Sequence, residues 1–133
     1  MKRNMKLVVA VLAAAGVGAG TTAIAAEQMG VSKNEIVVGT IQDLSGPLAG
    51  FGKALRFGMQ MRVDEVNEAG GINGRKVELV SLDDRNDRKA AGANAEKLVN
   101  GNGAVALFGF ASATLSLDAM PVVKERKVPF FGS

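Results

Sequence analysis

At 133 residues the chain has room for one small domain. Its formal net charge is +3, but the first 26 residues hold three of the 16 basic residues and none of the 13 acidic ones, so the remainder is formally neutral. A nucleic-acid-binding protein needs a basic footprint, and this balance offers none, so we do not expect nucleic acid as a partner.

Residues 1–26 have the three regions of a secretory signal peptide. The start is basic, residues 7–20 form an uncharged apolar run, and small side chains precede the predicted cleavage point, which lies after Ala25 or Ala26. The competing interpretation is an uncleaved membrane anchor, because the whole uncharged stretch reaches the roughly 20 residues that a spanning helix needs. Its glycines and threonines weaken a helix and favour a removed signal.

The chain contains no cysteine, so neither a disulfide nor a lipidated cysteine is available. An exported protein of this sequence must be held together by its core alone. We therefore predict a soluble product located in the periplasm. The expected organisation is a signal peptide at residues 1–26 followed by a single lobe at residues 27–133.

The first half of the mature sequence predicts a strand, a helix and a second strand. Glu35 to Ile41 is a short β-branched run typical of a buried strand, and residues 42–50 form a loop after it. Apolar residues then recur at three- and four-residue spacing from Phe51 to Val66, which predicts an amphipathic helix. Gly70 and Gly71 end this helix, and residues 76–82 alternate as the second strand.

The second half repeats this alternation. A helix is predicted for residues 88–100 with Asp87 as its N-cap, a strand for 104–109, a helix for 113–125 and the start of a fourth strand at 128–131. The order is βαβαβαβ. Strands that alternate with helices indicate right-handed crossovers, so the predicted fold class is α/β, a parallel sheet with helices on both faces.

In such sheets ligands bind outside the carboxyl ends of the strands. The loops at that edge are residues 42–50, 83–87 and 110–114, and two of them carry small hydroxyl residues, Ser45 in the first and Ser112 with its neighbours in the third. Hydroxyls and free amides at a helix N-terminus attract carboxylates, but serine and threonine cap ordinary helices as often. The residues alone leave both interpretations open.

Other kinds of site fit the sequence poorly. A phosphate-binding loop fails at Pro47 and Ala54, where its pattern needs glycine and a hydroxyl residue. Asp83, Asp84 and Asp87 lack the glycine and the distal glutamate of a calcium loop, so we expect a solvated loop with a helix cap and no metal. The chain has no histidine and offers no catalytic triad; no catalytic residue and no cofactor is predicted.

Three stretches together are similar to one known family. They are Ile36–Gly39 with Leu44–Gly52, then Ala69–Val77 with its Gly-Gly-Ile-Asn-Gly sequence, and Phe108–Gly109 followed by Ser112, Ser116, Pro121 and Val128–Pro129. In this combination the chain resembles the leucine/isoleucine/valine-binding family of periplasmic proteins, which have the type I solute-binding fold. The resemblance covers nearly all of residues 35–133.

The resemblance implies a substrate-binding subunit that captures a branched-chain or related amino acid and delivers it to an inner-membrane ABC permease, without making or breaking a bond. Phe51 matches an aromatic position beside the ligand, and Ser112 with Ala113 matches the pair that holds its carboxylate at the third helix. Ala113 stands where many members have serine, so its amide, Ser112 or Thr114 would take that role. With Ser45, these are the candidate ligand-binding residues.

The chain ends at Gly132 and Ser133, where the family's fourth strand leads into a second carboxylate-binding loop. We therefore expect that loop and the second lobe to lie outside this sequence. Two alternatives stay open. The same fold binds other small solutes, such as an amide, a urea or an aromatic acid, and it also serves as the ligand-sensing lobe of receptors.

Overall fold

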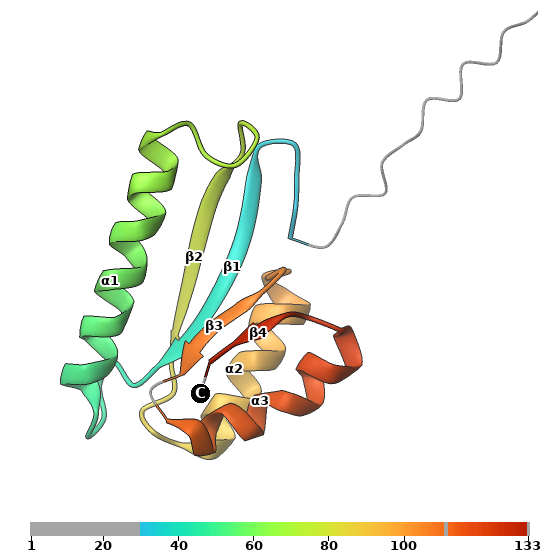
Figure 1. Cartoon of the computed structure of the whole chain (residues 1–133). Coiled ribbons are helices and arrows are strands. Elements are labelled where there is room, and N and C mark those ends of the chain that lie inside the picture. Colours follow the sequence, from blue (N-terminus) through green and yellow to red (C-terminus); the bar gives the residue numbers. More distant parts are fainter. Residues whose placement is uncertain (1–29, 111, 133) are drawn as a thin grey trace, which may run out of the picture.

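The structure is a computed structural model that describes residues 30–110 and 112–132 (Figure 1). The strands form one parallel sheet in the order β2-β1-β3-β4. The elements are β1 (Glu35–Gln42), α1 (Ala49–Glu68), β2 (Lys76–Asp83), α2 (Arg88–Glu96), η1 (Lys97–Gly101), β3 (Leu107–Phe110), α3 (Ala113–Arg126) and β4 (Phe130–Phe131). The predicted α/β order is confirmed, and the signal peptide predicted at residues 1–26 lies outside the described residues.

Helices lie on both faces of the sheet (Figure 1). α1 packs over β1 and β2 on one face, while α2 and α3 pack against each other on the opposite face. The core lies on that second side and consists mainly of fully or almost fully buried aliphatic side chains: Ile41, Ala91, Ala95, Leu98, Val99, Ala104, Leu107, Leu115, Ala119, Val122, Val123 and Val128. The buried core is therefore unevenly shared between the two faces.

The face of α1 that packs toward the sheet follows the predicted periodicity. Leu55, Met59, Val63 and Val66 are half-buried at spacings of four, four and three residues. Phe51, which the same pattern places on this face, is instead 58% exposed. It lies in the first turn of the helix, beyond the part of the sheet that α1 covers.

The ends of the helices follow local signals. α1 ends before Gly70 and Gly71, which both have positive φ, and the Gly71 amide donates to the Val66 carbonyl at 2.8 Å. The Asp87 carboxylate accepts a hydrogen bond of 2.8 Å from the Ala90 amide, so the predicted N-cap of α2 is confirmed. Among the residues described, none of the helices is long and apolar enough to span a membrane.

The structure corrects two predicted boundaries. The helix predicted for residues 88–100 divides at Glu96 and continues as a π-helical turn, η1. The strand predicted from residue 104 begins only at Leu107. Residues 104–106 still run along β1, because the Val105 amide donates to the Val37 carbonyl and the Ala106 carbonyl accepts from the Gly39 amide, both at 2.9 Å. These two bonds come from neighbouring residues and not from one, so the regular ladder starts only after them.

Candidate functional site

The carboxyl ends of the parallel strands meet at one edge of the molecule (Figure 1). Gln42 at the end of β1 pairs with Asp83 at the end of β2, so the loops that follow both strands start side by side. The turn between β3 and α3 opens at the same edge (Figure 1). This is the edge at which ligands of open parallel sheets bind.

The loop after β1 is built around Asp43, which is fully buried. Its carboxylate accepts hydrogen bonds from the amides of Gly46 and Leu48, at 2.5 and 2.7 Å. Gly46 is needed here, because a β-carbon at this position would lie 2.8 Å from both carboxylate oxygens of Asp43. The loop is therefore held in one shape by its own first residue.

Ser45 is held within this edge of the fold. Its hydroxyl donates to Oδ2 of Asp83 at 2.5 Å, while Oδ1 of Asp83 accepts hydrogen bonds from the amides of Leu44 and Arg85. The Ser45 hydroxyl is the largest of several causes that lower the pKa of Asp83. This hydroxyl joins the first loop to the second.

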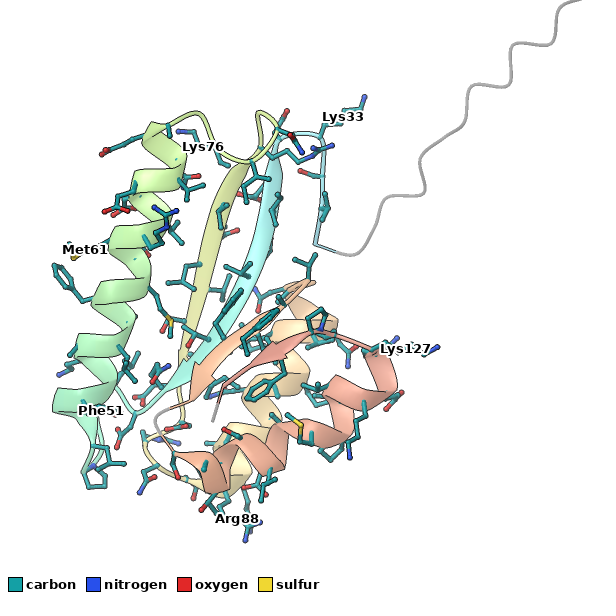
Figure 2. All side chains as sticks on the ribbon, viewed as in Figure 1. Lys33, Phe51, Met61, Lys76, Arg88 and Lys127 are labelled. Atoms are coloured by element: carbon teal, nitrogen blue, oxygen red, sulfur yellow. The ribbon has the colours of Figure 1, made fainter. Side chains whose placement is uncertain are left out.

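Phe51 lies in the first turn of α1 at the same edge (Figure 2). Its ring is 58% exposed, and the next residue, Gly52, packs directly against the backbone of Asp43. The first loop thus fixes where α1 begins and leaves the ring of Phe51 open to solvent.

The turn before α3 is positioned by buried polar side chains of β1. Gln42 donates through Nε2 to the Gly109 carbonyl and to Oγ1 of Thr40, both at 2.9 Å, and the Thr40 hydroxyl donates to the same carbonyl. Gly109 has φ +48, a conformation that favours glycine. These contacts fix the end of β3 three residues before Ser112.

Ser112 is the N-cap residue of α3, with extended backbone, but its side chain makes no capping hydrogen bond. Its carbonyl accepts from both the amide and the hydroxyl of Ser116, and the first turn of the helix holds no acidic residue. Ala113 and Thr114, at the first two helical positions, are exposed. The amides of this first turn therefore face an edge where no side-chain cap competes for them.

Two hollows adjoin this part of the molecule. One of about 350 Å³ is lined by Ala113, Thr114, Ser116, Leu117, Met120 and Phe130. A larger one of about 440 Å³ lies on the opposite face between α1 and the sheet and is almost wholly apolar, with Met59, Val63, Leu79, Phe108 and Phe131 among its lining residues. The rings of Phe108 and Phe131 stack there with centroids 5.1 Å apart.

The second hollow was not predicted. In the sequence, Phe108 and Phe131 lie in apolar stretches that predict buried strands. Only the position of α1 shows that their face of the sheet is left open. Phe51 and Ser45 line neither hollow.

The acidic loop after β2 corrects another expectation. The sequence predicts a solvated loop at Asp83 to Asp87, yet Asp84 is fully buried. It lies beside Asp43, a residue the sequence analysis did not single out, and these two with Asp83 have the chemistry to hold a cation. The sequence does contain an indication for Asp43, because Asp43 directly follows β1 in the same way as Asp84 follows β2.

Comparison with known proteins adds to this geometry. A family model described as periplasmic binding protein matches residues 35–133. The chain is 32% identical over 125 residues to a Leu/Ile/Val-binding protein homologue of Brucella melitensis, which covers 94% of this chain and 31% of the relative. The chain thus spans about a third of the length of this curated relative.

Solved structures share the fold. The branched-chain amino acid transporter substrate-binding protein of Streptococcus pneumoniae, solved in complex with isoleucine, superimposes with a TM-score of 0.71 at 31% identity, over 74% of this chain and 28% of that protein. A fatty acid ABC transporter substrate-binding protein of Thermomonospora curvata gives a TM-score of 0.73 at 27% identity, over 80% of this chain and 27% of that protein.

Proposed function

The chain belongs to the periplasmic binding protein family, and from this premise we propose that it is part of the substrate-binding subunit of an ABC importer for a branched-chain or related amino acid. The relatives named for leucine, isoleucine and valine, and the neighbour solved with isoleucine, support this class of solute. This is a family of solute-binding proteins. Binding requires no covalent step and no cofactor.

The observation that carries the proposal is the uncapped start of α3 at the carboxyl edge of the sheet. A helix N-terminus offers unpaired amides and a partial positive charge, and a carboxylate gains charge-assisted hydrogen bonds there. Ser112 makes no capping bond of its own, so its hydroxyl and the amides of Ala113 and Thr114 form a compact set of donors. We assign them the carboxylate of the solute.

Phe51 supplies the apolar contact in this proposal. It is a large exposed ring at the same edge, on a helix whose start is fixed by Asp43. Ser45 contributes indirectly, because its hydroxyl is already bonded to Asp83 and thereby shapes the loop. In this proposal a second lobe closes over the solute and presents it to an inner-membrane permease. We assign that lobe to the part of the relatives' length that this chain does not span.

Export to the periplasm is part of the same proposal. The basic start and apolar run of residues 1–26 support a signal peptide cleaved after Ala25 or Ala26. Mass spectrometry of the exported protein measures the new N-terminus directly, and an intact leader on membrane-bound material would contradict it.

The test of the site is calorimetry on the full-length protein with leucine, isoleucine, valine and their amides. Because a charge-assisted hydrogen bond contributes about 1.5–3 kcal/mol, Ser112→Asp should weaken binding of the acids by roughly 10- to 100-fold. Phe51→Ala should weaken acids and amides alike. The matched control is Ala93→Asp, which adds the same charge at an exposed position on α2 that lines neither hollow.

Wild-type affinity in Ser112→Asp, or equal affinity for acid and amide in the wild type, would show that the start of α3 does not hold the carboxylate.

A second class of solute is favoured by one comparison, since the Thermomonospora curvata neighbour is named for fatty acids and Ala113 lacks the hydroxyl of many members. A fatty acid also presents a carboxylate, so it belongs in the same titration panel.

A further inference from the structure

Three carboxylates converge where the loops after β1 and β2 begin. Asp43 follows the last residue of β1, and Asp83 with Asp84 stands at the end of β2. One carboxylate oxygen from each lies within 4.8 Å of the others. Asp43 and Asp84 are both fully buried, so these charges are not simply spread over a solvated surface.

The hydrogen bonds around the cluster are unequally distributed. The carboxylates of Asp43 and Asp83 accept hydrogen bonds through both of their oxygens. Asp84 accepts one bond at Oδ1, from the Asn86 amide at 2.8 Å, while its buried Oδ2 has no hydrogen-bond partner. A buried carboxylate oxygen without a partner is costly, which points to a missing partner of opposite charge.

The electrostatic balance points the same way. Burial raises the pKa of Asp84, and the neighbouring Asp43 and Asp83 carboxylates raise it further. Arg85 acts on Asp83, whose pKa it helps to lower. The salt bridges among the described residues join Arg62 to Glu65 and Arg88 to Asp118, so neither compensates this cluster.

The shape of the cluster fits a hard cation. Besides the three carboxylates, the backbone carbonyl of Arg85 lies close to the carboxylate of Asp43, because a β-carbon on Gly46 would lie 2.7 Å from that carbonyl and 2.8 Å from both oxygens of Asp43. Calcium binds such oxygens at about 2.3–2.6 Å, so its ligands are spaced up to about 5 Å across the ion. Magnesium demands a tighter octahedron with about 2.1 Å bonds.

We propose that Asp43, Asp83 and Asp84 form a binding site for a calcium ion that joins the loop after β1 to the loop after β2. The unpartnered oxygen of Asp84 becomes a ligand, and the two buried charges gain a counterion. The ion enters from the side of Asp83, which is the least buried of the three. The role of the ion is structural. The proposal does not depend on which solute the protein binds.

The test is a calorimetric and thermal titration of the purified, chelator-treated full-length protein with calcium chloride and, separately, magnesium chloride. Calcium should bind with half-saturation at about 0.1–1 mM, the range of extracellular calcium modules. The melting temperature should then rise by about 5 °C at roughly 10 mM calcium and much less with magnesium.

Two variants locate the site. Asp84→Asn should weaken calcium binding by about tenfold or more, because affinity follows the number of charged ligands. In calcium-free buffer it should be at least as stable as the wild type, since it removes an uncompensated buried charge. Asp64→Asn is the control, because Asp64 is an exposed carboxylate on α1 bonded to Gln60. If Asp84→Asn fails to fold, Asp83→Asn gives the same test at a less buried position.

No calcium-dependent heat or stabilisation up to about 10 mM would overturn the proposal, because this concentration exceeds the expected half-saturation. An equal stabilisation by magnesium would also overturn it, because this would indicate general screening of charge. The same holds if Asp84→Asn and Asp83→Asn respond to calcium as the wild type does. A lower stability of Asp84→Asn than of the wild type in calcium-free buffer would also count against the proposal, because Asp84 would then not be an uncompensated buried charge.

Discussion

Two glycines of α1 lie in opposite environments. A β-carbon at Gly52 would lie 2.0 Å from the carbonyl oxygen of Asp43, whereas one at Gly58 would meet nothing within 4 Å. Gly52 lets the helix start against the first loop, and without that approach Phe51 would not sit at the carboxyl edge. Gly58 is exposed and has no such contact.

The two positions therefore predict opposite effects of the same substitution. Gly58→Ala should raise the free energy of unfolding by about 0.5–1 kcal/mol, because alanine loses less backbone entropy in a helix. Gly52→Ala should lower it by about 1–3 kcal/mol through overpacking against backbone that has little room to yield. Urea denaturation followed by circular dichroism measures both, and effects of the same sign would contradict this account of α1.

Sequence patterns succeeded at residues whose role is local. The cap at Asp87 and the stop at Gly70 follow from short-range rules, and the structure confirms both. Because charged residues usually lie outside, the sequence predicts a solvated loop at Asp84, and this prediction is wrong. Its burial depends on the register between β1 and β2, which pairs Gln42 with Asp83 and is set by contacts distant in the sequence.

At the scale of elements, α2 and α3 begin differently although the sequence offers a capping residue before each. Asp87 caps α2 with a hydrogen bond to the Ala90 amide, and Ser112 leaves α3 without a side-chain cap. The two helices are also joined by the ion pair between Arg88 and Asp118, at 2.8 Å. The ion pair therefore helps to hold α2 and α3 together without a side-chain cap at the start of α3.

Replacing Asp87 and Ser112 by alanine should show which of the two side chains stabilises its helix as a cap. Asp87→Ala should lower the free energy of unfolding by about 1 kcal/mol, whereas Ser112→Ala should change it by less than about 0.5 kcal/mol. Thermal denaturation of both variants beside the wild type is the measurement. A loss at Ser112 as large as at Asp87 would mean that its hydroxyl caps the helix and is not free for a solute.

The structure departs from the sequence patterns in two elements. Periodicity predicted every helix and strand, but it gave β3 three extra residues and did not foresee η1. Residues 104–106 remain bonded to β1 through the Val105 amide and the Ala106 carbonyl, but these are two neighbouring residues and not one, so the regular ladder begins after them. Such a local irregularity in strand pairing leaves no periodic signal in the sequence.

At the scale of the whole molecule, the sheet is covered unequally. α2 and α3 cover one face, whereas on the other face α1 covers β1 and β2 and leaves the apolar hollow beside β3 and β4 (Figure 1). Phe131 in this hollow is 57% exposed. An open apolar surface next to a two-residue strand favours association between molecules.

We therefore expect the 133-residue chain on its own to be marginally stable and to self-associate. A complete domain is stabilised by only about 5–15 kcal/mol, and an uncovered face removes part of that margin. The chain should bind a hydrophobic dye strongly and sediment as a mixture of species. A sharp, cooperative thermal transition of a monomer would contradict this.

A matched pair of charge substitutions tests whether the hollow is the cause. Phe131→Glu places a charge among its lining residues, while Phe57→Glu places the same charge on α1 at a phenylalanine that is 68% exposed and outside that lining. Phe131→Glu should lower dye fluorescence and shift sedimentation toward the monomer, and Phe57→Glu should change both much less, because Phe57 does not line the hollow. Equal effects would mean that association follows total exposed hydrophobicity. An effect confined to Phe131 would identify the open face between α1 and β4 as the surface that the rest of a complete lobe must cover.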